Sequence, residues 1–177
     1  IFTQVYGIGP AKAKELVNKH GIKTIAELRK HTDLLNDKQK IGLQYYEAIL
    51  ERIPRSEITQ FKTHFTKVFK TCGSDTSSFE IVGSYRRGAA DSGDIDVIIT
   101  DTTGSNDVFN TCLDKMIEKK LITEVLSRGK VKSLVIGKLP GKPARRIDFL
   151  FTPPEEHAYA TLYFRSEEHT SELQSPC

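Results

Sequence analysis

The sequence predicts an α+β fold in which a helical N-terminal part is followed by a mixed β-sheet backed by helices. Apolar residues recur at helical spacing up to about residue 72. Short β-branched runs, separated by turn residues, dominate the second half of the 177-residue chain. Helices that cover one face of such a sheet would complete the fold.

The N-terminal region is expected to begin with a helical hairpin. Gly7-Ile8-Gly9-Pro10 predicts a tight turn that opens a helix from about Pro10 to His20, because proline suits the first helical turn and a glycine follows the last. Thr24 and Glu27 have the spacing of a capping box and start a second, short helix. A helix N-terminus after a glycine turn presents N–H groups to a phosphate, although an ordinary helical hairpin has the same pattern.

Two further helices are expected before the sheet. Asp37 to Leu50 predicts the first, and a linker through Arg52-Ile53-Pro54 leads to a longer helix that ends near Gly73. Apolar residues on one face of the longer helix indicate that it faces a core: Ile58, Phe61, Phe65, Val68 and Phe69. The histidines of this half are expected at the surface: His20, His31 and His64.

Five strands and two more helices are expected in the second half. The strands are Phe79–Val82, Asp94–Thr100, Leu121–Leu126, Val131–Ile136 and Arg146–Phe151. Asn106 and Asp107 predict the start of a helix that runs to about Lys120, and Pro153 to Glu156 open a last helix.

Three aspartates are candidates for a metal site. Side chains alternate along a strand, so Asp94 and Asp96 point to one face, and Asp148 lies in a second predicted strand. If these strands pair, three carboxylates converge and repel one another, which a divalent cation such as Mg²⁺ would resolve. Two such ions can stabilise the attacking and the leaving oxygen of a phosphoryl transfer. The alternative is one carboxylate that caps a helix and two that face solvent.

The residues before these aspartates suit a phosphate. The Gly83-Ser84 turn supplies backbone N–H groups and a hydroxyl. Arg86 and Arg87 supply guanidinium groups that match phosphate oxygens, although Arg86 also fits a solvated surface pair. Together with the aspartates, this turn predicts a nucleotidyltransferase.

These motifs resemble those of the family X DNA polymerases, and within that family the beta type most closely. The resemblance covers about residues 1 to 164, and its most specific part is Gly83 to Asp96. It implies a helix-hairpin-helix DNA-binding subdomain over residues 1–53 and a nucleotidyltransferase palm over residues 54–164. The matching stretches are Gly7–Pro10, Gly21–Thr24, Ile41–Tyr46, Arg52–Arg55, Gly83–Val97, Arg145–Asp148 and Leu162–Phe164.

The resemblance also implies a role for each site residue. Asp94, Asp96 and Asp148 would be catalytic and hold two Mg²⁺ ions, and Asp148 would help to activate the primer 3′-hydroxyl. The residues implied to bind the incoming nucleotide are Arg52, Ser84, Arg87, Gly93, Asp94, Tyr163 and Phe164. The residues implied to bind DNA are Gly7, Gly9, Lys132 and Arg146. The backbone carbonyls of Thr3, Val5 and Ile8 match a site for a monovalent cation, Na⁺ or K⁺.

The implied activity is template-directed DNA synthesis in gap-filling base excision repair. The expected partners are primer-template or gapped DNA and a deoxynucleoside triphosphate, and the protein is expected to be a nuclear monomer. The short turn at Ser127–Lys130 favours template use, because template-independent relatives carry a long loop at this position. Ten Lys and Arg against six Asp and Glu in residues 1–55 suit phosphate contacts.

Composition limits the remaining classes of protein. The chain is 38% hydrophobic and 28% charged, as in soluble globular proteins, and no apolar run approaches the length of a membrane span, so no membrane partner is expected. The three cysteines, Cys72, Cys112 and Cys177, fit neither a zinc site nor a disulfide framework and indicate a reducing compartment.

Two other functions and an unusual C-terminus complete the expectations. The chain could be a non-catalytic DNA-binding fragment that uses the helix-hairpin-helix alone, or a nucleotidyltransferase that acts on RNA or protein. Residues 165–177 are expected to be a non-native tail translated from a sequencing adapter, with a natural polar tail as the alternative. Without the family's nucleotide-binding subdomain, this chain is expected to have little activity by itself.

Overall fold

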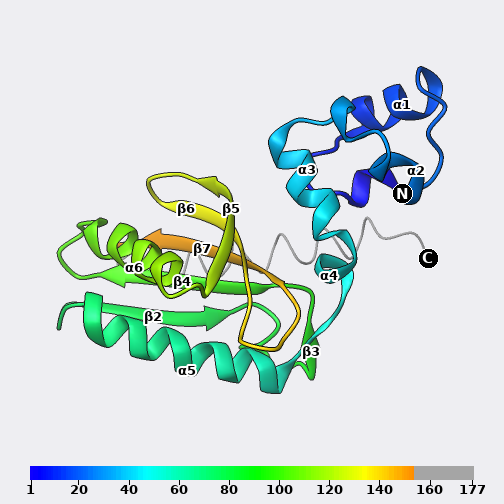
Figure 1. The fold of residues 1–177 in the computed structure, drawn as a ribbon. Coiled ribbons are helices and arrows are strands. Elements are labelled where there is room, and N and C mark those ends of the chain that lie inside the picture. Colours follow the sequence, from blue (N-terminus) through cyan, green and yellow to red (C-terminus); the bar gives the residue numbers. More distant parts are fainter. Residues whose placement is uncertain (154–177) are drawn as a thin grey trace. The chain divides into compact units, whose positions relative to one another are not determined.

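The computed structural model describes residues 1–153, and the chain divides at Leu50/Glu51 into two compact units (Figure 1). The expected last helix, the residues Tyr163 and Phe164 and the expected tail at 165–177 all lie outside the described residues. Within residues 1–153, no helix has the length and apolar character that crossing a membrane requires.

The first unit consists of short helices around a small core. Its elements are η1 (Phe2–Gln4), α1 (Pro10–Asn18), α2 (Ile25–Arg29), η2 (Thr32–Leu34), α3 (Asp37–Gln44) and α4 (Tyr46–Leu50). The Thr24 hydroxyl accepts the Glu27 N–H at 3.1 Å, as the capping-box spacing predicted. Buried apolar side chains from these elements form one cluster: Phe2, Val5, Ile8, Leu16, Ile22, Leu28, Leu35 and Leu43.

The single helix expected over Asp37–Leu50 is wrong, because the structure divides it into α3 and α4 at Tyr45. The Tyr45 backbone lies outside the helical region, at φ −102° and ψ 16°, and its N–H points to the carbonyls of both Ile41 and Leu43. A shared hydrogen bond of this kind is common where a helix ends. An apolar pattern that runs through the break cannot reveal it.

The second unit contains a five-stranded mixed sheet. Its elements are β1 (Ile53–Pro54), α5 (Arg55–Cys72), β2 (Ser77–Val82), β3 (Asp91–Ser92), β4 (Ile95–Asp101), α6 (Asp107–Glu118), β5 (Ile122–Arg128), β6 (Lys132–Gly137) and β7 (Arg145–Thr152). The strand order is β2-β4-β7-β6-β5, and β4 and β7 run parallel while the other neighbours are antiparallel. This arrangement confirms the predicted mixed sheet backed by helices.

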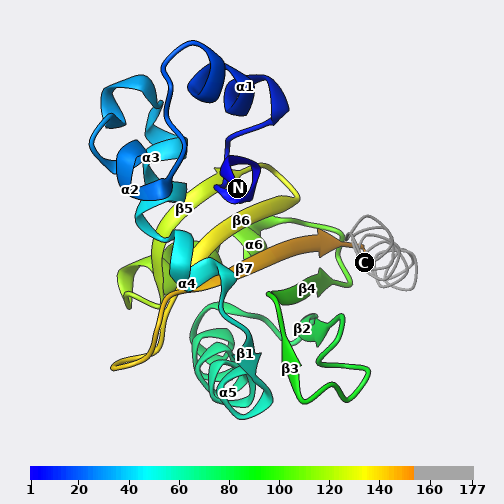
Figure 2. The same ribbon diagram turned by 90° about the vertical axis from the view of Figure 1, so that its right-hand side faces the viewer.

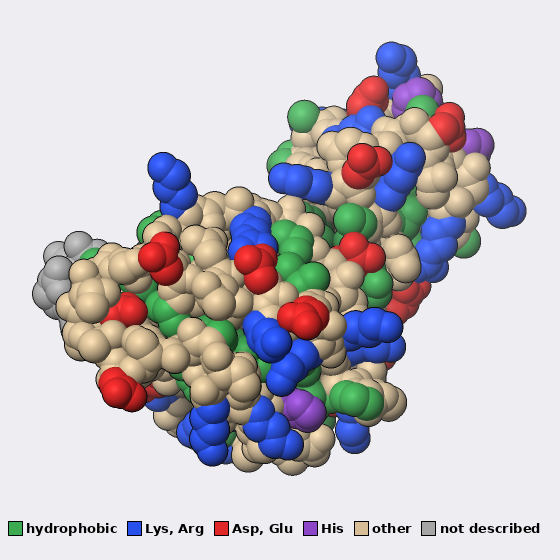
Figure 3. Space-filling view, turned by 60° about the vertical axis from the view of Figure 1, so that its left-hand side comes forward, with side chains coloured by type: hydrophobic (Ala, Val, Ile, Leu, Met, Phe, Trp, Pro, Cys, Tyr) green, Lys and Arg blue, Asp and Glu red, His purple; other side chains and the backbone are tan. Residues whose placement is uncertain are grey.

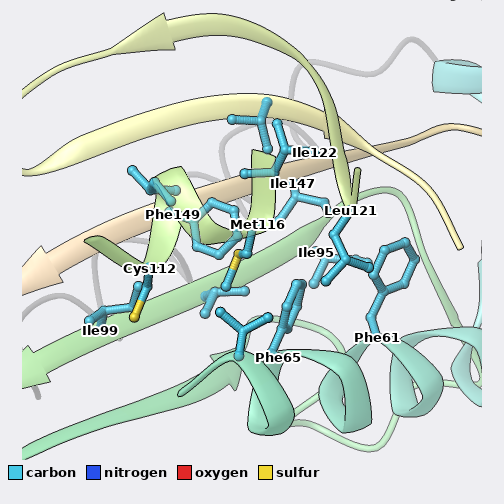
Figure 4. Close-up of a cluster of buried hydrophobic side chains, with 14 of the residues drawn as sticks. Phe61, Phe65, Ile95, Ile99, Cys112, Met116, Leu121, Ile122, Ile147 and Phe149 are labelled. Carbon is cyan, nitrogen blue, oxygen red and sulfur yellow. The ribbon is translucent and has the colours of Figure 1, made fainter. Parts of the chain in front are cut away.

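The helices α5 and α6 cover one face of this sheet. Phe61 and Phe65 from α5 pack with Met116 and Cys112 from α6 against Phe149 of β7 and its neighbours (Figure 4). The rings of Phe65 and Phe149 meet edge to face with centroids 5.8 Å apart. The opposite face carries only a smaller apolar cluster of Val82 and Ile98 with Leu150, and α5 and α6 do not cover it.

Two features of this unit differ from the expectations. The residues expected as a linker form β1, which pairs with β3 beside the start of α5 (Figure 2). A disulfide joins Cys72 of α5 to Cys112 of α6, so the expectation that the cysteines form no disulfide was wrong for this pair. The packing of two helices brings together thiols that are 40 residues apart in the sequence, and spacing alone does not show this.

Candidate active site

The structure brings the three aspartates together at one end of the sheet. Strands β4 and β7 pair in parallel with Asp96 directly beside Asp148, and Asp94 precedes Asp96 by two residues. One carboxylate oxygen from each aspartate lies within 4.8 Å of the others. The strand pairing on which a shared metal site depends is therefore present.

These carboxylates lie on the sheet face that α5 and α6 leave uncovered. Their neighbours Ile95 and Ile147 belong to the core under the helices. Because side chains alternate along a strand, Asp96 and Asp148 point to the opposite face of the sheet. Asp96 is 5% exposed and Asp148 7%, while Asp94 is half-buried. The cluster therefore sits in a partly desolvated position that is reached from one side.

The charge around the aspartates favours a bound cation. The Arg146 Nε lies 3.4 Å from an oxygen of Asp148, at the edge of a cluster of three carboxylates. Like charges this close repel, and the partial burial of two of them increases the cost. Oxygen ligands from several carboxylates suit a hard cation such as Mg²⁺. The residues present thus fit a divalent cation.

A glycine-bounded turn precedes the aspartates. Gly83 and Gly88 have φ of +71° and +88°, which other residues rarely adopt, so glycine is needed at both ends of the turn. The carbonyl of Ser84 in this turn accepts the N–H of Ala89, the residue that follows the turn, at 3.0 Å. The Ser84 hydroxyl donates to the buried Ser92 hydroxyl at 2.6 Å, which fixes the Ser84 side chain on the strand that leads to Asp94.

Arg55 supports this turn from α5, although sequence reasoning gave it no role. Its Nη1 donates to the Tyr85 carbonyl at 2.6 Å, and its guanidinium lies 4.2 Å from the centre of the Tyr85 ring. An arginine at the first position of a helix places its positive charge at the positive end of the helix dipole, which is unfavourable. That unfavourable position is the signal that could have indicated a specific partner for Arg55.

Arg52 reaches the same region through the pairing of β1 with β3. Its Nε and Nη2 donate to Asp91 Oδ1 at 3.0 and 2.8 Å, although the Arg52 side chain remains 62% exposed. A Cβ atom on Gly93 would lie 3.4 Å from Arg52 Nη1, which is an ordinary contact distance. The geometry places Arg52 beside Gly93, the residue that precedes Asp94.

The two arginines of the turn are both exposed. Arg86 Nε lies 3.4 Å from Glu80 Oε1, and both side chains are well exposed, which fits the alternative of a surface pair for Arg86. Arg87 is exposed in the turn itself. The phosphate contact expected of Arg87 stays a prediction.

Lys132 and Arg146 lie on the same sheet face as the aspartates. Arg146 and Asp148 are two positions apart along β7, so their side chains point to the same face. Lys132 of β6 pairs with Leu150, which is two residues beyond Asp148. Both cationic side chains therefore flank the carboxylates on the uncovered face. This position is compatible with the DNA contacts expected for them.

The remaining predicted residues lie in the first unit. Gly7 has φ +89° and its carbonyl accepts the Gln39 Nε2–H at 2.9 Å, while Gly9 is the N-cap of α1. The Val5 carbonyl accepts the Ile8 N–H at 3.1 Å within the turn that follows η1, and Thr3 is exposed. These facts place the residues in one turn region and leave the expected cation there a prediction.

Comparisons with known proteins match both units. The family model for the DNA polymerase beta palm matches residues 52–154, and the model for the fingers domain of DNA polymerase lambda matches residues 1–50. DNA polymerase lambda of Rattus norvegicus is 29% identical over 178 aligned residues, which cover 96% of this chain and 30% of that protein.

Two further relatives extend this similarity. DNA polymerase lambda of Arabidopsis thaliana is 39% identical over 109 residues, or 60% of this chain and 20% of that protein. The DNA polymerase type-X family protein pol4 of Schizosaccharomyces pombe is 28% identical over 172 residues, or 92% of this chain and 33% of that protein. The chain thus spans a third or less of the length of these relatives.

Proposed function

Because the chain belongs to the family X DNA polymerases, we propose that it is part of a template-directed repair polymerase that fills gaps in base excision repair. In this reaction the primer 3′-hydroxyl oxygen attacks the α-phosphorus of a deoxynucleoside triphosphate, and pyrophosphate leaves. The observation that carries the proposal is the carboxylate cluster of Asp94, Asp96 and Asp148 on paired strands beside the Gly83–Gly88 turn.

Each carboxylate and cation of the site has a role in this proposal. Asp94, Asp96 and Asp148 would hold two Mg²⁺ ions, which when bound supply positive charge to the reacting oxygens. Asp148 would also accept the proton of the primer hydroxyl when that oxygen attacks. Arg146, 3.4 Å from Asp148, orients that carboxylate near the primer terminus.

In this proposal the triphosphate is held by the turn and by Arg52, the residue before β1. Ser84 and Arg87 bind phosphate oxygens from the turn, and Gly93 lets the nucleotide approach the backbone beside Asp94. Arg52 binds the phosphates from the other side, where Asp91 now holds its guanidinium. Catalysis in this scheme is positioning and charge stabilisation, as in other phosphoryl transfers. Tyr163 and Phe164 are proposed to contact the sugar.

The first unit supplies contacts to the DNA backbone. We take residues 1–53 as a helix-hairpin-helix subdomain in which Gly7 and Gly9 bring N–H groups to a phosphate. A monovalent cation on the carbonyls of Thr3, Val5 and Ile8 would bridge to that phosphate, and Lys132 would approach the template strand. Such contacts position DNA without reading its sequence. The protein would act as a monomer in the nucleus.

Mutation of Asp148 tests the catalytic role. In the full-length parent protein, Asp148→Ala should abolish nucleotide incorporation on gapped DNA, while binding to the same DNA largely persists. Asp33→Ala, which removes an exposed carboxylate of the first unit, is the matched control and should extend primers normally. Near-normal extension by the Asp148→Ala protein would contradict the proposal.

A Mg²⁺ titration separates this function from a non-catalytic DNA-binding module. If the carboxylates bind the ion, the thermal midpoint of the wild-type chain should rise with Mg²⁺ concentration. A palm that serves only as a scaffold has no reason to respond. An unchanged midpoint would therefore favour the non-catalytic alternative.

A further inference from the structure

The second unit has a hollow of about 570 Å³ on its helical side, away from the aspartates. It lies between α5, the C-terminal end of α6 and the segment that follows β6, and its lining residues are His64, Lys67, Val68, Lys119, Lys120, Leu121, Lys138 and Pro140. Figure 3 shows lysine and arginine side chains gathered with a histidine on part of this unit.

The charge of this hollow is positive. Four of its eight lining residues are lysines, and His64 adds a group that can become cationic. Among residues 1–153, no ion pair involves Lys67, Lys119, Lys120 or Lys138, whereas the nearby Lys115 pairs with Glu118 at 3.4 Å. All four lysine side chains are exposed, and positive charge collected on one part of a surface favours an approaching anion.

Ordinary roles in the fold account for only part of this cluster. Lysines at a helix C-terminus interact favourably with the dipole, which explains Lys119 and Lys120 at the end of α6. Lys67 lies within α5 and Lys138 follows β6, so the dipole of α6 does not account for them.

The backbone at Lys120 adds a further observation. The Leu121 N–H bonds to the Met116 carbonyl at 2.9 Å and the Lys120 N–H to the Ile117 carbonyl at 3.0 Å, which together form a Schellman motif. Lys120 has φ +62° at the position where glycine is usual. A glycine would satisfy the backbone there without steric cost, whereas lysine places an ammonium group at the rim of the hollow.

We propose that this hollow binds closely spaced phosphate groups, at a site separate from the carboxylate cluster. Lysine ammonium groups act as point charges that suit phosphates, and the lining holds no arginine fork and no Phe, Tyr or Trp on which a base could stack. Val68 and Leu121 are buried and form an apolar floor beneath the exposed lysines. The volume lies in the range of small-ligand sites, which favours a compact oligophosphate.

The site is independent of the proposed polymerase centre. The helices α5 and α6 pack on the sheet face that carries Ile95 and Ile147, and the aspartates project from the other face. A ligand in the hollow therefore touches neither the metal site nor the Gly83–Gly88 turn. Failure of either proposal leaves the other unaffected.

The test uses inorganic tripolyphosphate and the full 177-residue chain in EDTA, so that no metal holds the probe at the aspartates. Amide resonances of Val68, Leu121 and Lys138 report binding in the hollow, and those of Ser84 and Arg87 report the turn. We expect saturable shifts at the first group. The affinity for tripolyphosphate should fall by about tenfold or more in the triple pocket variant Lys67→Gln/Lys119→Gln/Lys138→Gln.

A matched control removes three exposed lysines elsewhere in the same unit: Lys62→Gln/Lys70→Gln/Lys130→Gln. This control should bind tripolyphosphate like the wild type. If the triple pocket variant gives a poorly dispersed spectrum, the single variant Lys138→Gln replaces it and should still weaken binding. Absence of pocket shifts in the wild type, or equal affinity in pocket and control variants, would overturn the proposal.

A second probe, single-stranded oligo-dT, identifies the source of the phosphates. If the strand shifts the same three amides and competes with tripolyphosphate, the hollow accepts a nucleic-acid backbone. In that case the pocket variant should lower the slope of log K against log salt by about two, for three lost single-strand contacts. If only tripolyphosphate binds there, the ligand is a free oligophosphate.

Discussion

Arg145 and Glu57 form a buried ion pair between residues that lie 88 positions apart. Arg145 Nε donates to Glu57 Oε2 at 2.5 Å, and its Nη1 donates to the Arg52 carbonyl at 3.1 Å. Arg145 is the first residue of β7, the strand that carries Asp148, so this guanidinium joins that strand to the backbone of a proposed phosphate-binding residue. The pair thus couples core packing to the position of the site.

Glu57→Gln should lower the free energy of unfolding of the chain by about 3–5 kcal/mol, because the buried guanidinium then keeps only the exposed Glu51 carboxylate, 3.9 Å away, as a counter-charge. The control Glu118→Gln breaks an exposed pair with Lys115 and should cost about 1 kcal/mol or less. Urea denaturation of the three proteins measures both values. Equal losses of unfolding free energy in the two variants would show that the buried Arg145–Glu57 pair stabilises the fold no more than the exposed pair does.

The aspartate cluster should be a source of instability in the absence of metal. In EDTA, Asp96→Asn should raise the free energy of unfolding by about 1–3 kcal/mol, because it removes one of three carboxylates within 4.8 Å. With Mg²⁺ at a hundred times its dissociation constant, the wild type should gain about 2.7 kcal/mol and the variant much less. A variant that is less stable than the wild type in EDTA would argue against the predicted repulsion.

At the scale of elements, the disulfide between α5 and α6 holds together the two helices that cover the sheet. It closes a segment with a sequence separation of 40 residues that includes β2, β3 and β4, and with them Asp94 and Asp96. Closing a long segment limits the conformations of the unfolded chain. The site is thus built on a segment whose two ends are tied together.

Reduction of this disulfide should lower the free energy of unfolding by about 2–4 kcal/mol. The measurement is urea denaturation with and without dithiothreitol. Cys72→Ala/Cys112→Ala should show no response to the reductant, and so serves as the control. Since a nucleus keeps thiols reduced, the reduced value is the one that applies in the proposed location. A wild-type chain insensitive to dithiothreitol would show that the bond does not form in solution.

The elements that carry long patterns could be predicted from the sequence, and the short ones could not. The stripe from Ile58 to Phe69 identified α5, and the β-branched run after Asp96 identified β4, because each repeats its period several times. β1 and β3 contain two residues each, too few for any period. Their pairing nevertheless decides where Arg52 lies, so that part of the site needed the structure.

At the scale of the site, the sequence predicted the three carboxylates that converge but not the residues that support them. Asp94, Asp96 and Asp148 stand in motifs whose chemistry is local. Arg55 and Arg145 act through contacts with residues at least 30 positions away, which no local pattern encodes. His64 illustrates a different limit, because the expected surface histidine is half-buried and lines the lysine-rich hollow.

For the whole molecule, the feature to consider is how much of a related polymerase the chain matches. It covers 30% of the rat DNA polymerase lambda that it resembles, so most of that protein has no counterpart here. The carboxylate cluster, the turn and the basic first unit are nevertheless present within 153 described residues.

The 177-residue chain should bind gapped DNA but extend primers at least about 10²-fold more slowly than full-length rat DNA polymerase lambda. Rate acceleration depends on binding energy that orients the reacting groups, and a misplacement of about 1 Å already has a cost of this size. Primer extension and DNA binding are measured on the same gapped duplex in Mg²⁺, so that weak extension cannot reflect lost binding. Asp96→Asn should remove the residual extension and leave DNA binding in place. Extension within a few-fold of the full-length enzyme would show that the two units alone position primer and nucleotide.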